Sequence, residues 1–287
     1  MGTIQASKAR SYAKTSDWRM DGEIMYRAFS VEINDIYPLI CDESPKNIFA
    51  KVINNSLDSM YESICRLIID EDNTLSANQI MEDWFPSINA SVFISHSSCD
   101  KDDAVRFANW LYNNYGITSF IDSDFWECIS DLQKEIDKAF CRLQGEKSTY
   151  SYEKRNYSTA HVHMILAHAL TRMINQAECF FFIKSENSIS IENTFNLTFS
   201  PWIYHELETV DTIEIHEPIR ITNLTEDSEI RKSMECFSSK MVSYPVEGKR
   251  LISIDYDFLT KWENIGTDKD NLDELYRLVK NENYKYL

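Results

Sequence analysis

Residues 91–122 read SVFISHSSCDKDDAVRFANWLYNNYGITSFID, and they predict a strand, a helix and a second strand. Residues 91–95 are rich in β-formers and end at a polar loop, and residues 117–121 form a second apolar run. A strand, a helix and a strand in so short a segment predict a βαβ unit with parallel strands. The apolar side chains between the strands recur with helical spacing up to Gly116, a residue type common just after a helix: Ala104, Phe107, Ala108, Leu111 and Tyr112.

The rest of the chain continues this alternation. The run Cys179–Ile183 is continuously apolar, as expected for a central parallel strand that is buried on both faces. Ser200 and Pro201 are typical of the N-cap and first turn of a helix. Alternating strands and helices predict an α/β fold with a doubly wound parallel sheet. We expect further strands at 218–222 and 251–254, and further helices at 131–142, 158–175 and 272–279.

The N-terminal part of the chain shows a different pattern. Between residues 18 and 84, apolar residues recur at helical spacing, as Ile24, Ala28 and Val31 do, and the pattern changes near Pro86. We therefore expect a helical N-terminal extension over residues 1–87, an α/β domain over residues 88–265, and a C-terminal helix and tail over residues 266–287.

The composition excludes several classes of function. The chain has 287 residues, with 46 acidic and 29 basic side chains and a formal net charge of −17. Binding to nucleic acid or to an anionic membrane requires a basic surface, so we expect neither partner. The six glycines are too far apart to form the loops G-x-G-x-x-G or G-x-x-x-x-G-K-[ST]. This spacing excludes a Rossmann phosphate loop and a P-loop.

Cysteine, histidine and hydropathy patterns point to a cytoplasmic protein without a metal site. The seven cysteines are scattered without a C-x-x-C pair, and the longest apolar run, Cys179–Ile183, is too short to span a bilayer. The first thirty residues lack the apolar core of a signal peptide. His161, His163 and His168 do not have the spacing of a zinc-binding helix, so we expect no metal ligands among them.

Polar segments follow the predicted strands at the positions where α/β sheets bind ligands, outside the carboxyl ends. These segments are residues 95–98, 122–126 and 185–188. The helix that starts at Pro201 reaches the same edge and presents Trp202 and Glu206 as an i, i+4 pair. We therefore expect a cleft bordered by a tryptophan face and a carboxylate.

Four of these segments occur in an order that is similar to a known family. They are SVFISHSS with Asp100, then Phe120–Asp122, then Phe181–Ile183 with Ser188, then SPWIYHEL at residues 200–207. This set resembles the Toll/interleukin-1 receptor (TIR) domain as found in bacteria, over roughly residues 88–260. The resemblance implies a flavodoxin-like sheet of five parallel strands. The chain from Asp122 to Cys179 is longer than in a minimal TIR domain, which indicates an insertion at about 141–175.

The same resemblance implies an activity. Many bacterial and plant TIR domains cleave the bond between nicotinamide and ribose in NAD, so NAD is expected as a substrate and no cofactor is expected. The family's catalytic glutamate lies four residues after a tryptophan in a serine-started helix, and that position here is Glu206, after Trp202. The substrate-binding residues that the resemblance implies are Ser95, His96, Ser97, Asp122, Trp126 and Trp202.

These residue types suit the chemistry. Nicotinamide is positively charged in NAD and leaves without a general acid, so the group that needs stabilisation is the cationic ribose. A carboxylate such as Glu206 stabilises that charge, and an aromatic face such as Trp126 or Trp202 packs against the base or sugar. Attack by water, by the adenine of the same molecule or by another molecule gives ADP-ribose, a cyclic form or a conjugate, and the product stays open.

By the same resemblance we expect a NAD glycohydrolase or cyclase in bacterial anti-phage defence of the Thoeris type. Its nucleotide signal would reach a downstream effector, and the protein would form homo-oligomers through TIR contacts. Two alternatives stay open: a TIR scaffold that self-associates or docks a partner TIR without turnover, and a nucleoside-processing enzyme of the deoxyribosyltransferase type. The cations nearest to the expected site of the anionic dinucleotide are Arg155, Arg172 and Lys184.

Overall fold

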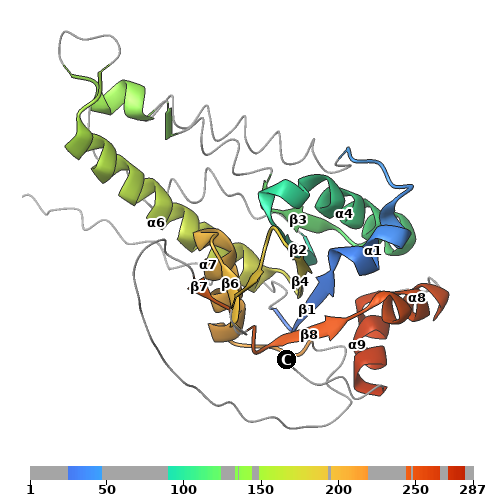
Figure 1. Cartoon of the computed structure of the whole chain (residues 1–287). Coiled ribbons are helices and arrows are strands. Elements are labelled where there is room, and N and C mark those ends of the chain that lie inside the picture. Colours follow the sequence, from blue (N-terminus) through green and yellow to red (C-terminus); the bar gives the residue numbers. More distant parts are fainter. Residues whose placement is uncertain are drawn as a thin grey trace, which may run out of the picture.

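A parallel β-sheet forms the centre of the protein (Figure 1). The computed structural model describes residues 25–46, 90–123, 133–134, 136–143, 149–192, 195–218, 244–246, 248–265 and 271–281. Within these residues the main sheet has five strands in the order β3-β2-β4-β1-β8, and each pairing is parallel. The strands are β1 (Arg27–Glu32), β2 (Val92–Ser95), β3 (Ser119–Ile121), β4 (Cys179–Lys184) and β8 (Leu251–Ile254).

The strand order contains a topological switch point. The chain passes from β2 to β3 on one side, and it then returns to β4 on the other side of β2. Ligands of open α/β sheets bind in the crevice at such a reversal, outside the carboxyl ends of the strands. The order β3-β2-β4 corresponds to the 2-1-3 part of the flavodoxin-like order, but here the next position is taken by the N-terminal strand β1.

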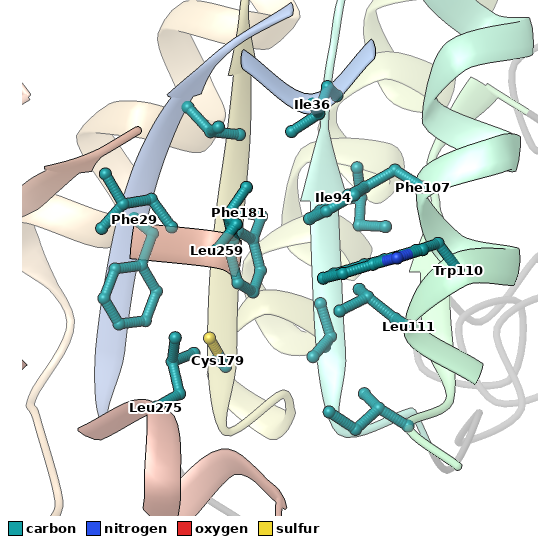
Figure 2. Packing of buried hydrophobic residues seen from close by; sticks show 14 of the residues in the cluster. Phe29, Ile36, Ile94, Phe107, Trp110, Leu111, Cys179, Phe181, Leu259 and Leu275 are labelled. Atoms are coloured by element: carbon teal, nitrogen blue, oxygen red, sulfur yellow. The ribbon is translucent and has the colours of Figure 1, made fainter. Parts of the chain in front are cut away.

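Helices cover both faces of the sheet, so the predicted doubly wound parallel α/β fold is confirmed (Figure 1). Phe181 of β4 points to one face, where its ring lies 5.3 Å from those of Phe29 and Phe107; Figure 2 shows this layer. Phe180 points to the opposite face, as the pleat of a strand requires. The first face is covered by α1 (Ile33–Ile40), α4 (Lys101–Tyr115), α8 (Tyr256–Ile265) and α9 (Asn271–Asn281), and the second by α6 (Tyr152–Gln176) and α7 (Pro201–Thr212).

The prediction that residues 18–84 are helical is wrong for residues 27–32. This segment is strand β1, which pairs with β4 on one side and with β8 on the other. Phe29 and Val31 pack into one core cluster and Ala28 into the other, so both faces are buried. The helical spacing of Ala28 and Val31 is also compatible with a buried strand, and the pairing with two neighbours decides the conformation. The sheet therefore includes a strand from the expected N-terminal extension (1–87), of which residues 1–24 and 47–87 lie outside the described residues.

Other elements agree with the predictions or shift from them. Strands β2, β3, β4 and β8 lie within or close to the predicted runs, and α9 agrees with the predicted terminal helix. The helix α6 begins at Tyr152 and not near Ser158, because Ser151 caps it by accepting a hydrogen bond from the backbone N–H of Lys154. A short π-helical turn, η2 (Asp137–Cys141), lies in the predicted helix 131–142. Apart from Pro218, the predicted strand 218–222 lies outside the described residues.

Part of the expected insertion at 141–175 packs against the main sheet. The second half of α6 packs Leu166, Ala169 and Met173 into the same cluster as Phe180 and Phe182 of β4. This half of the helix therefore covers the second face of the sheet. None of the helices in the described part of the chain has the length and apolarity that crossing a membrane requires.

A second, antiparallel sheet packs against α7. It consists of β5 (Ser190–Glu192), β6 (Phe195–Thr198) and β7 (Tyr244–Pro245), in that order. Tyr204 of α7 stacks on Tyr244 of β7, with ring centroids 4.6 Å apart. The start of α7 is thus held against this small sheet.

Phe181→Ala is expected to lower the free energy of unfolding by about 3–5 kcal/mol, because the buried ring fills space between β1, β4 and α4. Urea titration followed by circular dichroism measures this change. The matched control is Phe199→Ala, since Phe199 is 47% exposed, and a loss of about 0.5 kcal/mol or less is expected there. Equal losses in both variants would contradict this packing.

Candidate active site

The helix α7 carries Glu206 into the interior at the carboxyl edge of the sheet. As predicted, Ser200 is the N-cap, and its hydroxyl accepts a hydrogen bond from the backbone N–H of Ile203 at 3.3 Å. Ile203, Leu207 and Val210 form the face that packs into the core. Glu206 lies on this buried side and has an exposed fraction of 0%. A carboxyl group therefore occupies a position where an apolar side chain is usual.

Contacts at its last turn hold α7 against the start of β8. The guanidinium of Arg250 donates hydrogen bonds to the backbone carbonyls of Val210 and Ile213. The carboxylate of Asp211 accepts hydrogen bonds from the backbone N–H groups of Lys249 and Arg250, both at 3.1 Å. Since the last carbonyls of a helix lack intrahelical donors, Arg250 satisfies that of Val210, and these contacts together fix the orientation of α7.

Four of the predicted site residues meet beside the switch point. Ser95, the last residue of β2, donates a hydrogen bond from Oγ to Oε2 of Glu206 at 2.5 Å. Asp122, which follows β3, lies close enough for its negative charge to raise the pKa of the same carboxyl group. Nδ1 of His96 lies 3.2 Å from Oδ1 of Asp122. All four side chains are buried, although Ser95 and Glu206 are 111 positions apart in the chain.

Two of these side chains have polar atoms without hydrogen bonds. Among the described residues, Oε1 of Glu206 and both ring nitrogens of His96 have no hydrogen-bond partner of good geometry. The short distance between Nδ1 of His96 and Oδ1 of Asp122 is therefore a close polar contact and not an aligned hydrogen bond. A buried polar atom without a partner costs about 1–3 kcal/mol. Such atoms at a switch point are the feature expected of a site that completes its hydrogen bonds with a ligand.

Burial and a neighbouring negative charge raise the pKa of Glu206. Burial, and after it the negative charge of Asp122, raise the pKa of the Glu206 carboxyl well above its usual range. The hydrogen bond from Ser95 acts in the opposite direction and lowers this pKa. Glu206 therefore keeps its proton at a pH where an exposed glutamate has lost it. The sequence placed these residues at one edge but gave no sign of the influence of Asp122 on the pKa of Glu206.

The loops after β2 and β4 are joined by a polar cluster next to this site. Asp100, in the short 3-10 turn η1 (Ser98–Asp100), accepts hydrogen bonds from Oγ of Ser185 and from Nδ2 of Asn187. Oγ of Ser97 accepts a hydrogen bond from the backbone N–H of Cys99 and so caps the turn. The contact of Ser97 thus stabilises its own turn, and the hydrogen bonds from Ser185 and Asn187 to Asp100 fix the spacing of the two loops. Asp100 belongs to the polar loop quoted above, but the sequence did not reveal its partner.

The structure describes one of the two tryptophans expected at the site. Trp202 is half-buried, and its ring lies 5.5 Å from that of His163 on α6 in an edge-to-face arrangement. It packs against the same core cluster as α6 and α7. Trp202 therefore contributes to packing between these helices. Trp126 lies outside the described residues.

Two of the three expected cations form ion pairs with other residues, and the third is exposed. Arg155 forms an ion pair with the buried Asp137 at 2.9 Å, and Arg172 is exposed on α6. Lys184 forms an ion pair with Glu32 at 2.8 Å. Both residues line an open pocket at the carboxyl ends of β1 and β4, together with Ser185, Glu186, Ile189 and Ser190. In the part of the chain that the structure describes, no cluster of three or more His, Cys, Asp or Glu side chains could hold a metal ion.

The free energy of unfolding of Glu206→Gln, relative to the wild type, is expected to increase by about 1 kcal/mol or more from about pH 5 to about pH 8. The pKa of Glu206 is raised in the folded protein, so the stability that its proton contributes is lost as pH rises toward that pKa. Glutamine removes this loss. Urea titrations across this pH range measure the difference, and the exposed Glu208→Gln is the matched control. A constant difference at every pH would count against a raised pKa.

The chain was compared with protein-family models, with curated proteins and with solved structures, and nothing matches it. Support for a function therefore comes from the geometry of this site and from the sequence segments that meet there.

Proposed function

We propose that this protein is a TIR-type enzyme that cleaves the nicotinamide–ribose bond of NAD. It releases nicotinamide and forms ADP-ribose or a cyclic or conjugated ADP-ribose. The supporting observation is the hydrogen bond between Ser95 and Glu206, which joins the first and the last TIR-like segments at the switch point of the sheet. NAD is the substrate in this proposal, and no cofactor takes part.

The topology supports a TIR-like core in part. The strands β3, β2 and β4 have the order of the first three strands of a flavodoxin-like sheet, and α7 follows β4 in the chain. We propose that this flavodoxin-like sheet takes β1 as the strand beside β4. The N-terminal segment is then part of the catalytic domain.

The side chains of the site have chemically distinct tasks in this reaction. As nicotinamide leaves, positive charge develops on the ribose, and the carboxyl group of Glu206, in its ionised form, stabilises it. Oε1 of Glu206 accepts a hydrogen bond from a ribose hydroxyl, because it lacks a partner among the described residues. Ser95 holds Oε2 and so orients the carboxyl group. Nε2 of His96 also lacks a hydrogen-bond partner among the described residues, so it is a donor or acceptor for the substrate.

The biological setting follows from the resemblance to bacterial TIR domains. We propose a cytoplasmic enzyme of anti-phage immunity whose nucleotide product acts on a downstream effector. Homo-oligomers through TIR contacts are part of this proposal.

A surface of α6 favours the second candidate, a scaffold that acts by self-association. Tyr157 and Met164 lie on one side of the first half of α6 and are 70% and 60% exposed. His161, beside Tyr157, has its ring 4.3 Å away on the same side. Exposed apolar side chains that gather on one helix are typical of contact surfaces.

NAD cleavage tests the first proposal. Purified wild-type protein is expected to release nicotinamide from NAD, and Glu206→Gln is expected to release it at least ~100-fold more slowly, because the charge that stabilises the cationic ribose is lost. Chromatography of nicotinamide and of the nucleotide products measures both rates. Glu208→Gln, an exposed glutamate on the same helix, is the control and is expected to retain the wild-type rate.

Two outcomes would contradict this proposal. Equal rates in the wild type and in Glu206→Gln would remove Glu206 from the mechanism. Turnover of nucleosides with no turnover of NAD would instead support an enzyme of the deoxyribosyltransferase type.

Light scattering coupled to size-exclusion chromatography tests self-association. The wild type is expected to have a mass above the 33.6 kDa of one chain, and Tyr157→Ser/Met164→Ser is expected to shift it toward that value. Tyr37→Ser is the control, since Tyr37 is 58% exposed on the distant helix α1. A wild-type mass of one chain at every concentration would rule out this contact surface.

A further inference from the structure

The open pocket at the carboxyl ends of β1 and β4 lies on the same edge of the sheet as the candidate active site. Its volume is about 470 Å³, which is within the range of pockets that bind organic ligands. The hydrogen bond from Ser185 to Asp100 holds the loop after β4, so this wall of the pocket is fixed in place. The residues that line the pocket are Glu32, Lys184, Ser185, Glu186, Ile189 and Ser190.

The chain leaves β1 and β4 toward opposite faces of the sheet. The helix α1, which directly follows β1, covers the first face, and α7, the next described helix after β4, covers the second. Adjacent strands whose connections leave in opposite directions form a crevice at their carboxyl ends, and α/β sheets bind ligands in such crevices. The pocket occupies this crevice, since Glu32 and Lys184 are the last residues of β1 and β4.

The pleat of the strands puts this pocket and the candidate active site on the same face of the sheet. Ser95 and Lys184 each follow by two residues a phenylalanine, Phe93 and Phe182, that packs into the core cluster of the second face. Glu32 lies opposite Lys184 in the register of β1 and β4. Because side chains two residues apart in a strand share a face, and register partners do so as well, Ser95, Lys184 and Glu32 lie on the face that α7 covers.

The two sites are separated by a length that a dinucleotide spans. Ser95 lies opposite Phe182 of β4, and Lys184 is two residues further along this strand. Adjacent strands are about 4.8 Å apart and a strand rises about 3.3 Å per residue, so the backbone of Lys184 lies roughly 8 Å from that of Ser95. With the nicotinamide ribose of NAD at Glu206, the diphosphate and the second ribose extend over this separation.

The charged lining of the pocket matches an adenosine diphosphate group. Nζ of Lys184 lies 2.8 Å from Oε1 of Glu32, and the two side chains are 29% and 49% exposed. A lysine ammonium has three N–H donors, so Lys184 can keep this ion pair and also bind a phosphate oxygen. The carboxylate of Glu32 accepts hydrogen bonds from ribose hydroxyls, as an acidic side chain does in other dinucleotide sites. Glu186 is exposed, so solvent screens its charge.

We propose that this pocket binds the adenosine diphosphate half of NAD, with the diphosphate on Lys184 and the adenosine ribose on Glu32. The apolar side chain of Ile189 suits contact with adenine. Glu32 then selects NAD over NADP, because its negative charge repels a 2′-phosphate and its hydrogen bond to the 2′-hydroxyl is lost. Binding of adenosine diphosphate is a property of the pocket, whereas its part in turnover rests on the proposed function.

Calorimetric titration of the full-length protein with ADP tests the pocket without catalysis. The wild type is expected to bind ADP, and Lys184→Met is expected to bind it about tenfold or more weakly, because a charge-assisted hydrogen bond to phosphate is lost. Glu206→Gln, which alters the nicotinamide end of the site, is expected to bind ADP as tightly as the wild type. Lys154→Met, which removes an exposed lysine of α6, is the matched control and is also expected to retain this affinity.

Two results of the titration would overturn the proposal. One is a wild-type protein that does not bind ADP, and the other is Lys184→Met with the affinity of the wild type. Circular dichroism verifies that each variant is folded. Glu32→Gln provides a second, independent variant of the pocket, and it is expected to bind ADP more weakly because a neutral amide is a poorer acceptor for the ribose hydroxyls.

The kinetics of NAD cleavage distinguish one half of the substrate from a separate nucleotide. ADP is expected to compete with NAD, which raises the apparent KM and leaves kcat unchanged. Glu32→Gln is expected to reduce the preference for NAD over NADP in kcat/KM by about tenfold or more. Inhibition in which ADP lowers kcat at saturating NAD would place ADP at a separate site and overturn the proposal. If the wild type does not cleave NAD, the proposed function fails, and the ADP titration still decides whether the pocket binds the nucleotide.

Discussion

The pairing of β4 on both of its edges is the constraint on which the rest of the structure depends. This strand pairs with β2 on one side and β1 on the other, and five of its six residues are buried. A strand buried on both faces requires a layer of helices above and below, which α4 and α8 supply on one face and α6 and α7 on the other. Because all pairings are parallel, the carboxyl ends of β2, β4 and β1 meet at one edge. The hydrogen bond from Ser185 to Asp100 then fixes the two loops beside the switch point.

The candidate site contains buried polar atoms that the surrounding side chains do not satisfy. Polar contacts help to hold the frame together, as those of Arg250 with the end of α7 and of Arg155 with Asp137 illustrate. Beside the switch point, Glu206 and His96 have buried atoms without hydrogen-bond partners among the described residues. Buried groups of this kind lower stability, and they persist where surrounding packing holds them in place. The fixed ends of α7 provide this packing, so the carboxyl group stays where a ligand can use it.

Much of the frame was predictable because its signals are local. The alternation of strand and helix between 91 and 122, the apolar run of β4 and the cap at Ser200 each depend on neighbouring residues, and all three predictions are confirmed. The β1 segment was predicted wrongly because its apolar spacing fits a helix as well as a buried strand. Only its pairing with β4 and β8 separates the two conformations. Likewise, the cap at Ser151 places the start of α6 at Tyr152, before the predicted start at residue 158.

The sequence by itself determined the α/β class, the parallel strands and the residues at the carboxyl edge, since side-chain periodicity and caps act over a few residues. It placed Ser95, Asp122 and Glu206 at strand ends or on the helix beside them, because the carboxyl ends of parallel strands share one edge. Only the tertiary structure decided that β1 completes the sheet and that Ser95 hydrogen-bonds the carboxyl group of Glu206. These contacts join residues far apart in the chain. The protonation of Glu206 depends on burial, which is a property of the packed molecule and has no local signal in the sequence.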